Sequence, residues 1–224
     1  MADQWHGADL MSGITQALFM QSSGITVVGR AAAGASASST TFTINYPAGT
    51  QDGDLVVVFF ATGLNSATIT CSAATQILNT VYSGVTVALF RKTVSGESSI
   101  TATFSSSSGT TGASIAVFRN GAYSANAVTA PTASSIDPPS VSASAGNVVA
   151  TFGVESITTT SITNATETGY DVAYALATTT RGLVYVVGTK AITSGGTEDP
   201  PAYTLTGGTV SDTNEVFAAS VVIV

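Results

Sequence analysis

The stretch DLVVVFFA at residues 54–61 decides the fold class of this chain. It is short, rich in β-branched and aromatic residues, and preceded directly by Gly53, which is the pattern of a strand and not of a helix. Apolar side chains occupy successive positions, so both faces of the strand must be covered, as they are in the centre of a sandwich. The sequence therefore predicts a buried central β-strand here.

More strands, separated by turns, follow this stretch. In GVTVALFRK (84–92), Val85, Val87 and Leu89 alternate with Thr86, Ala88 and Phe90. SITATF (99–104) and ASIAVFRN (113–120) come next. The last run ends in Asn120-Gly121, a dipeptide typical of tight turns. Because strands do not alternate with helices, a parallel sheet is not expected, and the pattern favours an all-β, antiparallel β-sandwich.

The second part of the chain repeats the order of the first. NVVATFGV (147–154) follows a glycine as LVVVFF follows Gly53. GLVYVVGTKAITSG (182–195) resembles GVTVALFRKTVSG (84–96), and EVFAASVVIV (215–224) stands where ASIAVFRN stood. Repetition in the same order indicates an internal duplication.

The duplication defines the expected domain organisation. Residues 1–24 are predicted to form an N-terminal arm and residues 25–224 a β-sandwich domain, with two similar halves at about 25–129 and 140–224. The connection APTASSIDPPS (130–140) contains two prolines in a row, which exclude a central strand there. One jelly-roll-like domain, in which each half contributes strands to both sheets, buries the apolar runs best. The alternative is two separate small sandwiches joined in this connection.

Charge is scarce in this chain. Only 8% of the residues are Asp, Glu, Lys or Arg, whereas ordinary soluble domains contain roughly 25%. Ser and Thr take their place and make up about three residues in ten. Burying a hydroxyl at a contact costs far less than burying a charge. Such a surface suits a protein that packs against copies of itself or against neighbouring subunits.

The charge pattern also excludes several partners. The net charge is −7 and no stretch is rich in Lys or Arg, so the basic surface of a nucleic-acid binder is missing. The first residues carry Asp3 and Asp9 and no Lys or Arg before Arg30, which is the wrong charge for a secretory signal peptide. No apolar run approaches the length of about 20 residues needed to span a bilayer. We expect a protein made in the cytoplasm, with neither nucleic acid nor membrane as a partner.

Residues 1–24 differ in composition from the rest of the chain. They contain the only tryptophan, the only histidine and all three methionines, and four apolar residues are spaced to share one face of a short helix. Trp and Met are enriched in interface cores, so we expect an arm that docks on a partner protein. The alternative is a frayed leader without a role. The predicted partner-binding residues are Trp5 and the helix-face residues Leu10, Met11, Ile14 and Leu18.

Catalytic constellations are hard to build from these residues. Nucleophilic catalysis needs a base beside the nucleophile, and the only histidine, His6, lies in the arm outside the sandwich. Zinc sites need three or four His, Cys or carboxylate ligands, and one His with one Cys cannot supply a His/Cys set. The single cysteine, Cys71, is expected to be a buried, unreactive thiol. We predict no catalytic residues, no cofactor and no metal.

Paired carboxylates are the remaining enzymatic route, because glycoside hydrolysis needs only two, roughly 5–10 Å apart. The candidates lie at predicted strand ends or turns, where Asp and Glu are ordinarily solvated. The loop acids Asp52-Gly53-Asp54 and Glu198-Asp199 also offer oxygen ligands of the kind that calcium uses. Asp and Gly are equally the ordinary residues of turns, which is the interpretation we favour. The paired-carboxylate candidates are Asp52, Asp54, Glu155, Glu167 and Asp171.

Basic and aromatic residues raise two more choices. Arg91, Lys92 and Arg119 end apolar strands, where they are expected to meet solvent and to block the pairing of sheet edges. The alternative is ion pairs to acidic neighbours on another protein. Three tyrosines could stack on sugars, but their alternation within strands favours packing in the core or between the sheets. These are Tyr170, Tyr174 and Tyr185.

The order of these motifs resembles a β-sandwich module found in tail-fibre and other virion proteins of tailed bacteriophages. In that module Gly-Asp-Leu precedes a hydrophobic strand, an aromatic–basic pair precedes a glycine turn, and Val-Phe-Arg-Gly stands near mid-chain. The matching residues here are Gly53-Asp54-Leu55, Phe90-Arg91-Lys92, and Val117-Phe118-Arg119 with Asn120 before Gly121. The similarity covers roughly residues 45–224 and lacks the Gly-Trp usual between the first two long strands. It supplies no catalytic residue.

The resemblance implies a protein of the virion. Together with the arm and the low-charge surface, it leads us to expect a capsid decoration (cement) or head-fibre protein that docks on capsid subunits through residues 1–24. Its partners would be other virion proteins of the capsid or tail, and the chain would form a homo-oligomer such as a trimer. The first alternative is a tail-fibre adhesin that binds host surface glycans, for which Asn164–Tyr174 offers a sparse cluster of loop residues. The second is a polysaccharide depolymerase.

Overall fold

The computed structural model describes residues 24–36, 39–64, 67–82, 84–129, 135–157, 162–177, 182–207 and 216–224. All regular structure in these ranges is β-strand, and the strand pairings are antiparallel. The predicted all-β, antiparallel sandwich is therefore confirmed. None of the ranges contains a helix long and apolar enough to cross a membrane.

The first half of the chain folds as a sandwich of its own. Its main sheet has five strands in the order β1-β8-β3-β6-β5, and a three-stranded sheet, β2-β7-β4, covers one face of it. The strands of the main sheet, in that order, span Thr26–Ala35, Thr111–Arg119, Leu55–Thr62, Val85–Thr93 and Thr75–Tyr82. The covering strands span Ser39–Asn45, Ser99–Ser108 and Ile69–Thr70.

The second half repeats this arrangement. Its five-stranded main sheet has the order β13-β14-β11-β17-β9, which matches the first half strand for strand when it is read from β9. In the order printed, these strands span Asp171–Ala177, Gly182–Ala191, Val148–Ile157, Val216–Ile223 and Tyr123–Thr129. Two short pairs cover its outer face, β10 (Val141–Ala143) with β15 (Gly196–Glu198) and β12 (Asn164–Thr166) with β16 (Thr204–Thr206). The two similar halves predicted from the sequence are confirmed.

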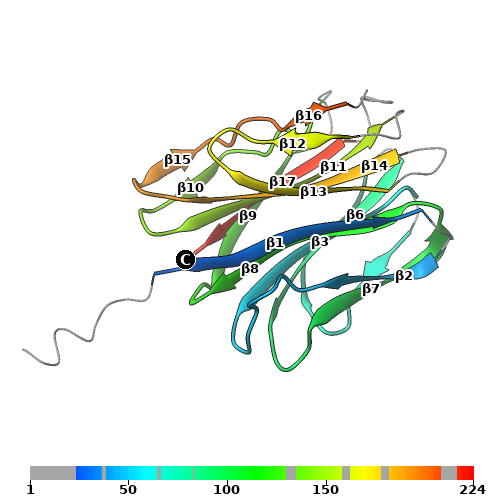
Figure 1. Ribbon diagram of the computed structural model, residues 1–224, viewed down its shortest axis with the longest axis horizontal. Coiled ribbons are helices and arrows are strands. Elements are labelled where there is room, and N and C mark those ends of the chain that lie inside the picture. Colours follow the sequence, from blue (N-terminus) through cyan, green and yellow to red (C-terminus); the bar gives the residue numbers. More distant parts are fainter. Residues whose placement is uncertain are drawn as a thin grey trace, which may run out of the picture.

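The two sandwiches stack into four layers (Figure 1). The main sheets lie in the middle and face each other, and the covering strands lie on the outside. Apolar side chains of both halves fill the space between the main sheets. Of the predicted first half, only β9 lies in the second main sheet, and the predicted second half contributes no strand to the first, so the expectation that each half contributes strands to both sheets was wrong. Strands that follow one another along the chain pair more readily than distant ones, which explains this result. The structural repeat begins at β9, before the predicted boundary.

The stretch that predicted the fold is β3, and both of its faces are buried. Val56, Val58 and Phe60 pack against the covering sheet of the first half. The alternate side chains face the second half, where Phe59 stacks on Phe217 with ring centroids 5.5 Å apart and an angle of 9° between the planes. A strand covered on both faces is confirmed, and one of its two covers is the other half of the chain.

One turn occurs in the same form in both halves. Gly53 and Gly146 each have a φ of 89°, a conformation that glycine adopts without strain. In each half the next residue turns its side chain back onto the chain. Asp54 accepts a hydrogen bond from the amide three positions earlier at 2.8 Å, and Asn147 does the same at 2.7 Å. The two halves therefore share the same turn, with the same side-chain hydrogen bond, as well as a similar order of sequence motifs.

The interiors of the two sandwiches differ at equivalent positions. In the first, the rings of Phe60 and Phe90 meet edge to face with centroids 6.2 Å apart. The registers of the main sheets place Gly153 and Gly188 at these positions in the second. Ile136, from the connection between the halves, fills the space beside Gly153, and polar side chains fill the space beside Gly188. The second interior is therefore polar where the first is aromatic.

The main sheets meet along two seams. At the closed seam, edge strand β1 lies against β13 and β14, and Gly34 is so near Ala177 that a Cβ on the glycine would come within 2.8 Å of the alanine Cβ. Arg30 crosses this seam. Its Nη1 donates to Thr189 Oγ1, and its Nη2 lies 3.6 Å from Asp171 Oδ2. At the open seam, β9 faces β5 and β6 across a cavity lined by both halves.

Candidate functional site

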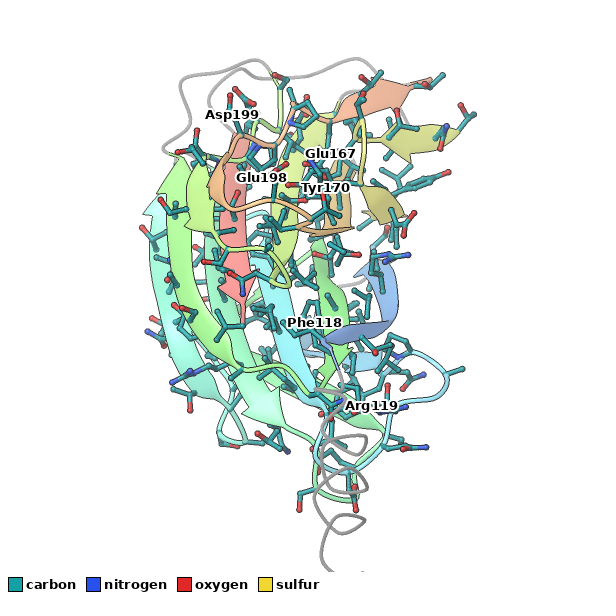
Figure 2. All side chains as sticks on the ribbon, turned by 90° about the vertical axis from the view of Figure 1, so that its left-hand side faces the viewer. Phe118, Arg119, Glu167, Tyr170, Glu198 and Asp199 are labelled. Atoms are coloured by element: carbon teal, nitrogen blue, oxygen red, sulfur yellow. The ribbon has the colours of Figure 1, made fainter. Side chains whose placement is uncertain are left out.

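The carboxylates singled out in the sequence are spread over three places. Figure 2 looks onto the end of the molecule that carries the turns before β3 and β11. Arg119 lies there in the lower, first sandwich, and Tyr170 and Glu198 lie in the upper, second sandwich. Asp52 and Asp54 lie in the turn before β3, Asp171 lies at the closed seam, and Glu155 and Glu167 lie inside the second sandwich.

Asp54 is buried, with 2% of its surface exposed, and is bound by Arg119. Arg119 Nε and Nη2 donate to its two carboxylate oxygens, each at 3.0 Å, and Nη2 also donates to the Gly49 carbonyl oxygen at 2.9 Å. Burial raises the pKa of Asp54, but the hydrogen bonds from Arg119 and the Gln51 amide, with the charge of Arg119, outweigh burial and bring the pKa below its ordinary value. The expectation of a solvated turn residue was wrong, because Asp54 ties the turn to the end of β8.

The exposed acids of this set also have protein partners. Asp52 Oδ1 accepts a hydrogen bond from the Gly96 amide at 2.6 Å, and Asp171 belongs to the ion pair of the closed seam. Asp199 Oδ1 accepts one from Ser140 Oγ at 2.6 Å. Each of these contacts joins the acid to a segment far away in the sequence. Within the described ranges, no group of three or more His, Cys, Asp or Glu side chains is placed to hold a metal ion.

Glu167 is the centre of a polar cluster inside the second sandwich and is 3% exposed. Thr151 Oγ1 donates to its Oε2 at 2.7 Å, and the Tyr203 hydroxyl lies 2.7 Å from Thr151 Oγ1. Its Oε1 is buried without a hydrogen-bond partner. Gly188 makes room for this arrangement, because a Cβ there would collide with Glu167 Oε2. Burial raises the pKa of Glu167 to about 7 against the opposing hydrogen bonds from Thr151 and Tyr203.

Glu155, on β11, lies in the same interior and is 2% exposed. Its Oε1 is also buried without a hydrogen-bond partner. Burial raises its pKa to about 7, and a hydrogen bond from the Ile136 backbone opposes this rise only in part. Both glutamates were expected to be solvated residues at strand ends or turns. That expectation was wrong, because their side chains turn toward the covering strands and away from solvent.

Glu198 connects this interior to the surface. Lys190 Nζ and the Tyr170 hydroxyl both donate to Glu198 Oε1, at 2.7 Å and 3.0 Å. The lysine amino group also lies 5.5 Å from the centre of the Tyr170 ring. Burial raises the pKa of Tyr170, and the charge of Glu198 raises it further. Figure 2 shows Glu167, Tyr170 and Glu198 gathered in the second sandwich.

The tyrosines and the cysteine pack as predicted. Tyr185 is fully buried between the main sheets, with its hydroxyl 3.4 Å from the Ala61 carbonyl oxygen of the other half. Tyr170 is buried, and Tyr174 donates to a backbone carbonyl at 2.8 Å. Cys71 is a buried free thiol whose pKa is raised, chiefly by burial. These residues stabilise the body of the protein.

Arg91, Lys92 and Arg119 do not protect sheet edges. They end β6 and β8, which are inner strands of the first main sheet, so that interpretation was wrong. Lys92 and Arg119 each pair with a carboxylate of their own sandwich. Arg91 instead lies over the Tyr123 ring, with Cζ 4.6 Å from the ring centroid. Arg91 is therefore the member of this set that acts across a seam.

The predicted docking arm lies outside the described residues, apart from Gly24. This applies to each of its partner-binding residues, which are Trp5, Leu10, Met11, Ile14 and Leu18.

Sequence reasoning missed the partners of the buried glutamates. Thr151 and Tyr203 beside Glu167, and Lys190 bound to Glu198, were not singled out, because single hydroxyls and lone lysines carry no motif. One signal was available. Aligning the sequences of the two halves puts Gly188 at the position of Phe90, which implies that other side chains fill the interior of the second sandwich. The buried carboxyls can take up and release protons, but the covering strands separate them from any large substrate.

No protein-family model, curated protein or solved structure matches this chain. The residues on which the resemblance to phage modules rests can nevertheless be placed. Gly53-Asp54-Leu55 and Val117-Phe118-Arg119 meet in the Asp54–Arg119 pair. They hold a turn against a strand, and the function has to be argued from the residues of this chain alone.

Proposed function

We propose that this protein is a structural component of a tailed-bacteriophage particle, a capsid decoration or head-fibre protein that docks through residues 1–24. The observation that carries the proposal is the duplicated sandwich with internally paired charges. A continuous apolar core joins the two main sheets. Ion pairs within the chain neutralise Arg30, Lys92, Arg119 and Lys190. Such a body has a hydroxyl-rich surface that suits contacts with neighbouring subunits.

The place at which the proposed arm joins the body supports the same proposal. Ile25 and Ile223 flank Gly121, and Ala122 exchanges two backbone hydrogen bonds with Val224, at 2.8 Å and 2.9 Å. Figure 1 shows the start of β1 and the C-terminal residue at the same end of the molecule. An arm bound to a capsid at this end would leave the four layers projecting from the shell, as a fibre or cement protein requires.

The two alternatives receive unequal support. A depolymerase needs two accessible carboxylates, but Glu155 and Glu167 are buried and the exposed Asp52 and Asp171 lie on different sandwiches. An adhesin is favoured by one observation, the cavity of about 300 Å³ at the open seam, which is at the lower end of the range for small-molecule sites, about 300–1,000 Å³.

Antibody labelling of particles tests the location. Particles purified from the cells that produce this chain are labelled with a gold-conjugated antibody against residues 25–224 and viewed by electron microscopy. Gold on the heads is expected. Gold confined to the tails would support the adhesin instead, and purified particles without label would overturn both forms of the proposal.

Removal of residues 1–24 tests the arm. The truncated chain is expected to unfold in one cooperative transition but to lose binding to particles that lack the protein, whereas the full chain binds. The Trp5→Ala, Leu18→Ala double variant should also lose binding. Val81→Ala, a change at an apolar residue that is 48% exposed on the body, is the matched control and should bind normally. Full binding by the truncated chain would contradict docking through the arm.

A further inference from the structure

Arg91 differs from the other described basic residues in its partners. No ion pair or hydrogen bond joins it to any acid of the described ranges, and its contact is the Tyr123 ring. In a chain with a net charge of −7, a guanidinium without an internal carboxylate indicates a place for an external anion. The paired residues are Arg30 with Asp171, Lys92 with Glu97, Arg119 with Asp54, and Lys190 with Glu198.

The two seams carry different residues at equivalent positions. Thr75 lies opposite Arg91 on β5 and β6, as Asp171 lies opposite Thr189 on β13 and β14. At the closed seam Asp171 supplies the carboxylate that Arg30 binds. At the open seam Thr75 occupies the position of Asp171, Arg91 that of Thr189, and Asn126 that of Arg30. The open seam therefore has its guanidinium on β6, beside a threonine instead of a carboxylate.

Space for a ligand lies beside Arg91. The cavity of about 300 Å³ at the open seam is lined by β5, β6 and the start of β9, including Thr75, Thr93 and Tyr123. A hollow of about 430 Å³ adjoins it, shares Thr75, Arg91 and Thr93, and adds Ser72. This space is larger than a lone carboxylate needs, and its walls carry hydroxyl groups from both strands.

Tyr123 positions the guanidinium without using its hydrogen bonds. The Arg91 Cζ lies over the ring, 4.6 Å from the centroid, and the Tyr123 hydroxyl donates to Asn126 Oδ1. A contact through the ring leaves the five N–H donors of the guanidinium available. These donors form a planar fork that binds a carboxylate through two parallel hydrogen bonds.

We propose that the open seam binds a carboxylate-bearing sugar, with Arg91 as the anchor and with Thr75 and Thr93 as hydrogen-bond partners of its hydroxyl groups. The carboxylate follows from the Arg91 guanidinium, which lies over the Tyr123 ring and pairs with no acid of the described ranges. The sugar follows from the hydroxyl-lined space around it. A phosphate is less suited to the site, because the neighbouring Lys92 is already bound to Glu97 at 2.8 Å. The site lies on the body and is therefore independent of a position on the head or the tail.

Calorimetric titration of the full chain with sodium glucuronate tests the site. Saturable binding of glucuronate is expected, with no binding of glucose. Arg91→Gln should weaken glucuronate binding about 10-fold to 100-fold, because it removes a charge-assisted, two-point hydrogen bond. Arg30→Gln makes the same change of charge at the closed seam, where the arginine is already paired, and should keep the affinity.

Further ligands and variants separate the parts of the proposal. Acetate bound as tightly as glucuronate would overturn the sugar assignment, and phosphate bound more tightly than glucuronate would overturn the carboxylate assignment. No glucuronate binding, or equal binding by Arg91→Gln, would overturn the site. Thr75→Val and Thr93→Val, which leave the charge intact, should weaken glucuronate binding and leave acetate binding unchanged. None of these outcomes alters the labelling of particles, so the site and the proposed function can fail separately.

Discussion

Arg119 and Asp54 form a two-point ion pair, with Nε and Nη2 of the arginine each 3.0 Å from one carboxylate oxygen. The pair fastens the turn before β3 to the end of β8, the neighbouring strand of the main sheet. In the second half, the register places Val224 at the position of Arg119, and the equivalent turn carries the neutral Asn147. The anion and its cation are therefore absent together in the second half.

Asp54→Ala should lower the free energy of unfolding by about 1–3 kcal/mol, because two charge-assisted hydrogen bonds and one to the Gln51 amide lose their acceptor. Urea unfolding followed by circular dichroism measures the change. Asn147→Ala is the matched control and removes one hydrogen bond, to the Ser144 amide. A loss in the control as large as that in Asp54→Ala would show that the ion pair adds nothing.

The protein should become more stable on mild acidification. The pKa values of Glu155 and Glu167 lie at about 7 in the fold, against an ordinary value of 4.5. Between these values the folded state holds protons that the unfolded state has released, so the free energy of unfolding falls as the pH rises. Each residue can contribute up to about 3 kcal/mol over this window. Urea unfolding at a series of pH values measures the slope.

The control for this pH dependence is the Glu155→Gln, Glu167→Gln double variant, which should flatten the slope in that window. A slope equal to that of the unchanged chain would assign the effect to other groups. Asp54 acts in the opposite direction and at lower pH. Because its pKa is lowered in the fold, its stabilisation is present above its unfolded pKa and is lost as the pH falls through the folded one.

Gly188→Ala should destabilise the second sandwich. The added methyl group would meet Glu167 Oε2, and it would lie 2.7 Å from Thr151 Oγ1 and 2.8 Å from the Tyr203 hydroxyl. Forcing an extra carbon into a packed interior costs about 1–3 kcal/mol, measured as a shift of the urea midpoint. Gly195→Ala is the control, since its nearest neighbour would be at an ordinary 3.6 Å. Equal midpoints for the two variants would contradict this account of the interior.

Phe59→Ala should destabilise both halves together. Phe59 stacks on Phe217 and contacts Phe152, with centroids 6.4 Å apart, so its removal leaves a cavity between the main sheets. The expected cost is about 3–5 kcal/mol. Amide hydrogen exchange should speed up in β3 and β11 alike. Faster exchange in the first half alone would mean that the two sandwiches unfold independently.

The sequence predicted where the strands lie, but it did not predict which sheets pack against each other. The run at 54–61 showed that both faces of β3 are covered, but the alternation of its side chains is the same whether the cover comes from its own half or from the other. The small residues of β1 carry a weak hydrophobic pattern, although Gly34 allows a close approach between the sandwiches. Which sheets face each other depends on shape complementarity between distant segments.

The candidate site could be predicted only in part. Acids at strand ends are usually solvated, so the positions of Glu155 and Glu167 in the sequence do not predict that they are buried. Their burial depends on Gly153 and Gly188, which replace aromatic residues found in the other half, and on Ile136 from the connection. The role of Arg91 depends on Tyr123, a residue of the opposite sheet. Neither relationship leaves a local pattern in the sequence.

Joining two sandwiches in one chain has a consequence for assembly. A symmetric pair of identical halves would present every surface feature twice, on opposite sides. Here the seams have diverged, so one side carries the tight crossing of Arg30 and the other carries Arg91 with its cavity. The protein therefore has two distinct sides, so copies arrayed in one orientation would all present the Arg91 cavity in the same direction.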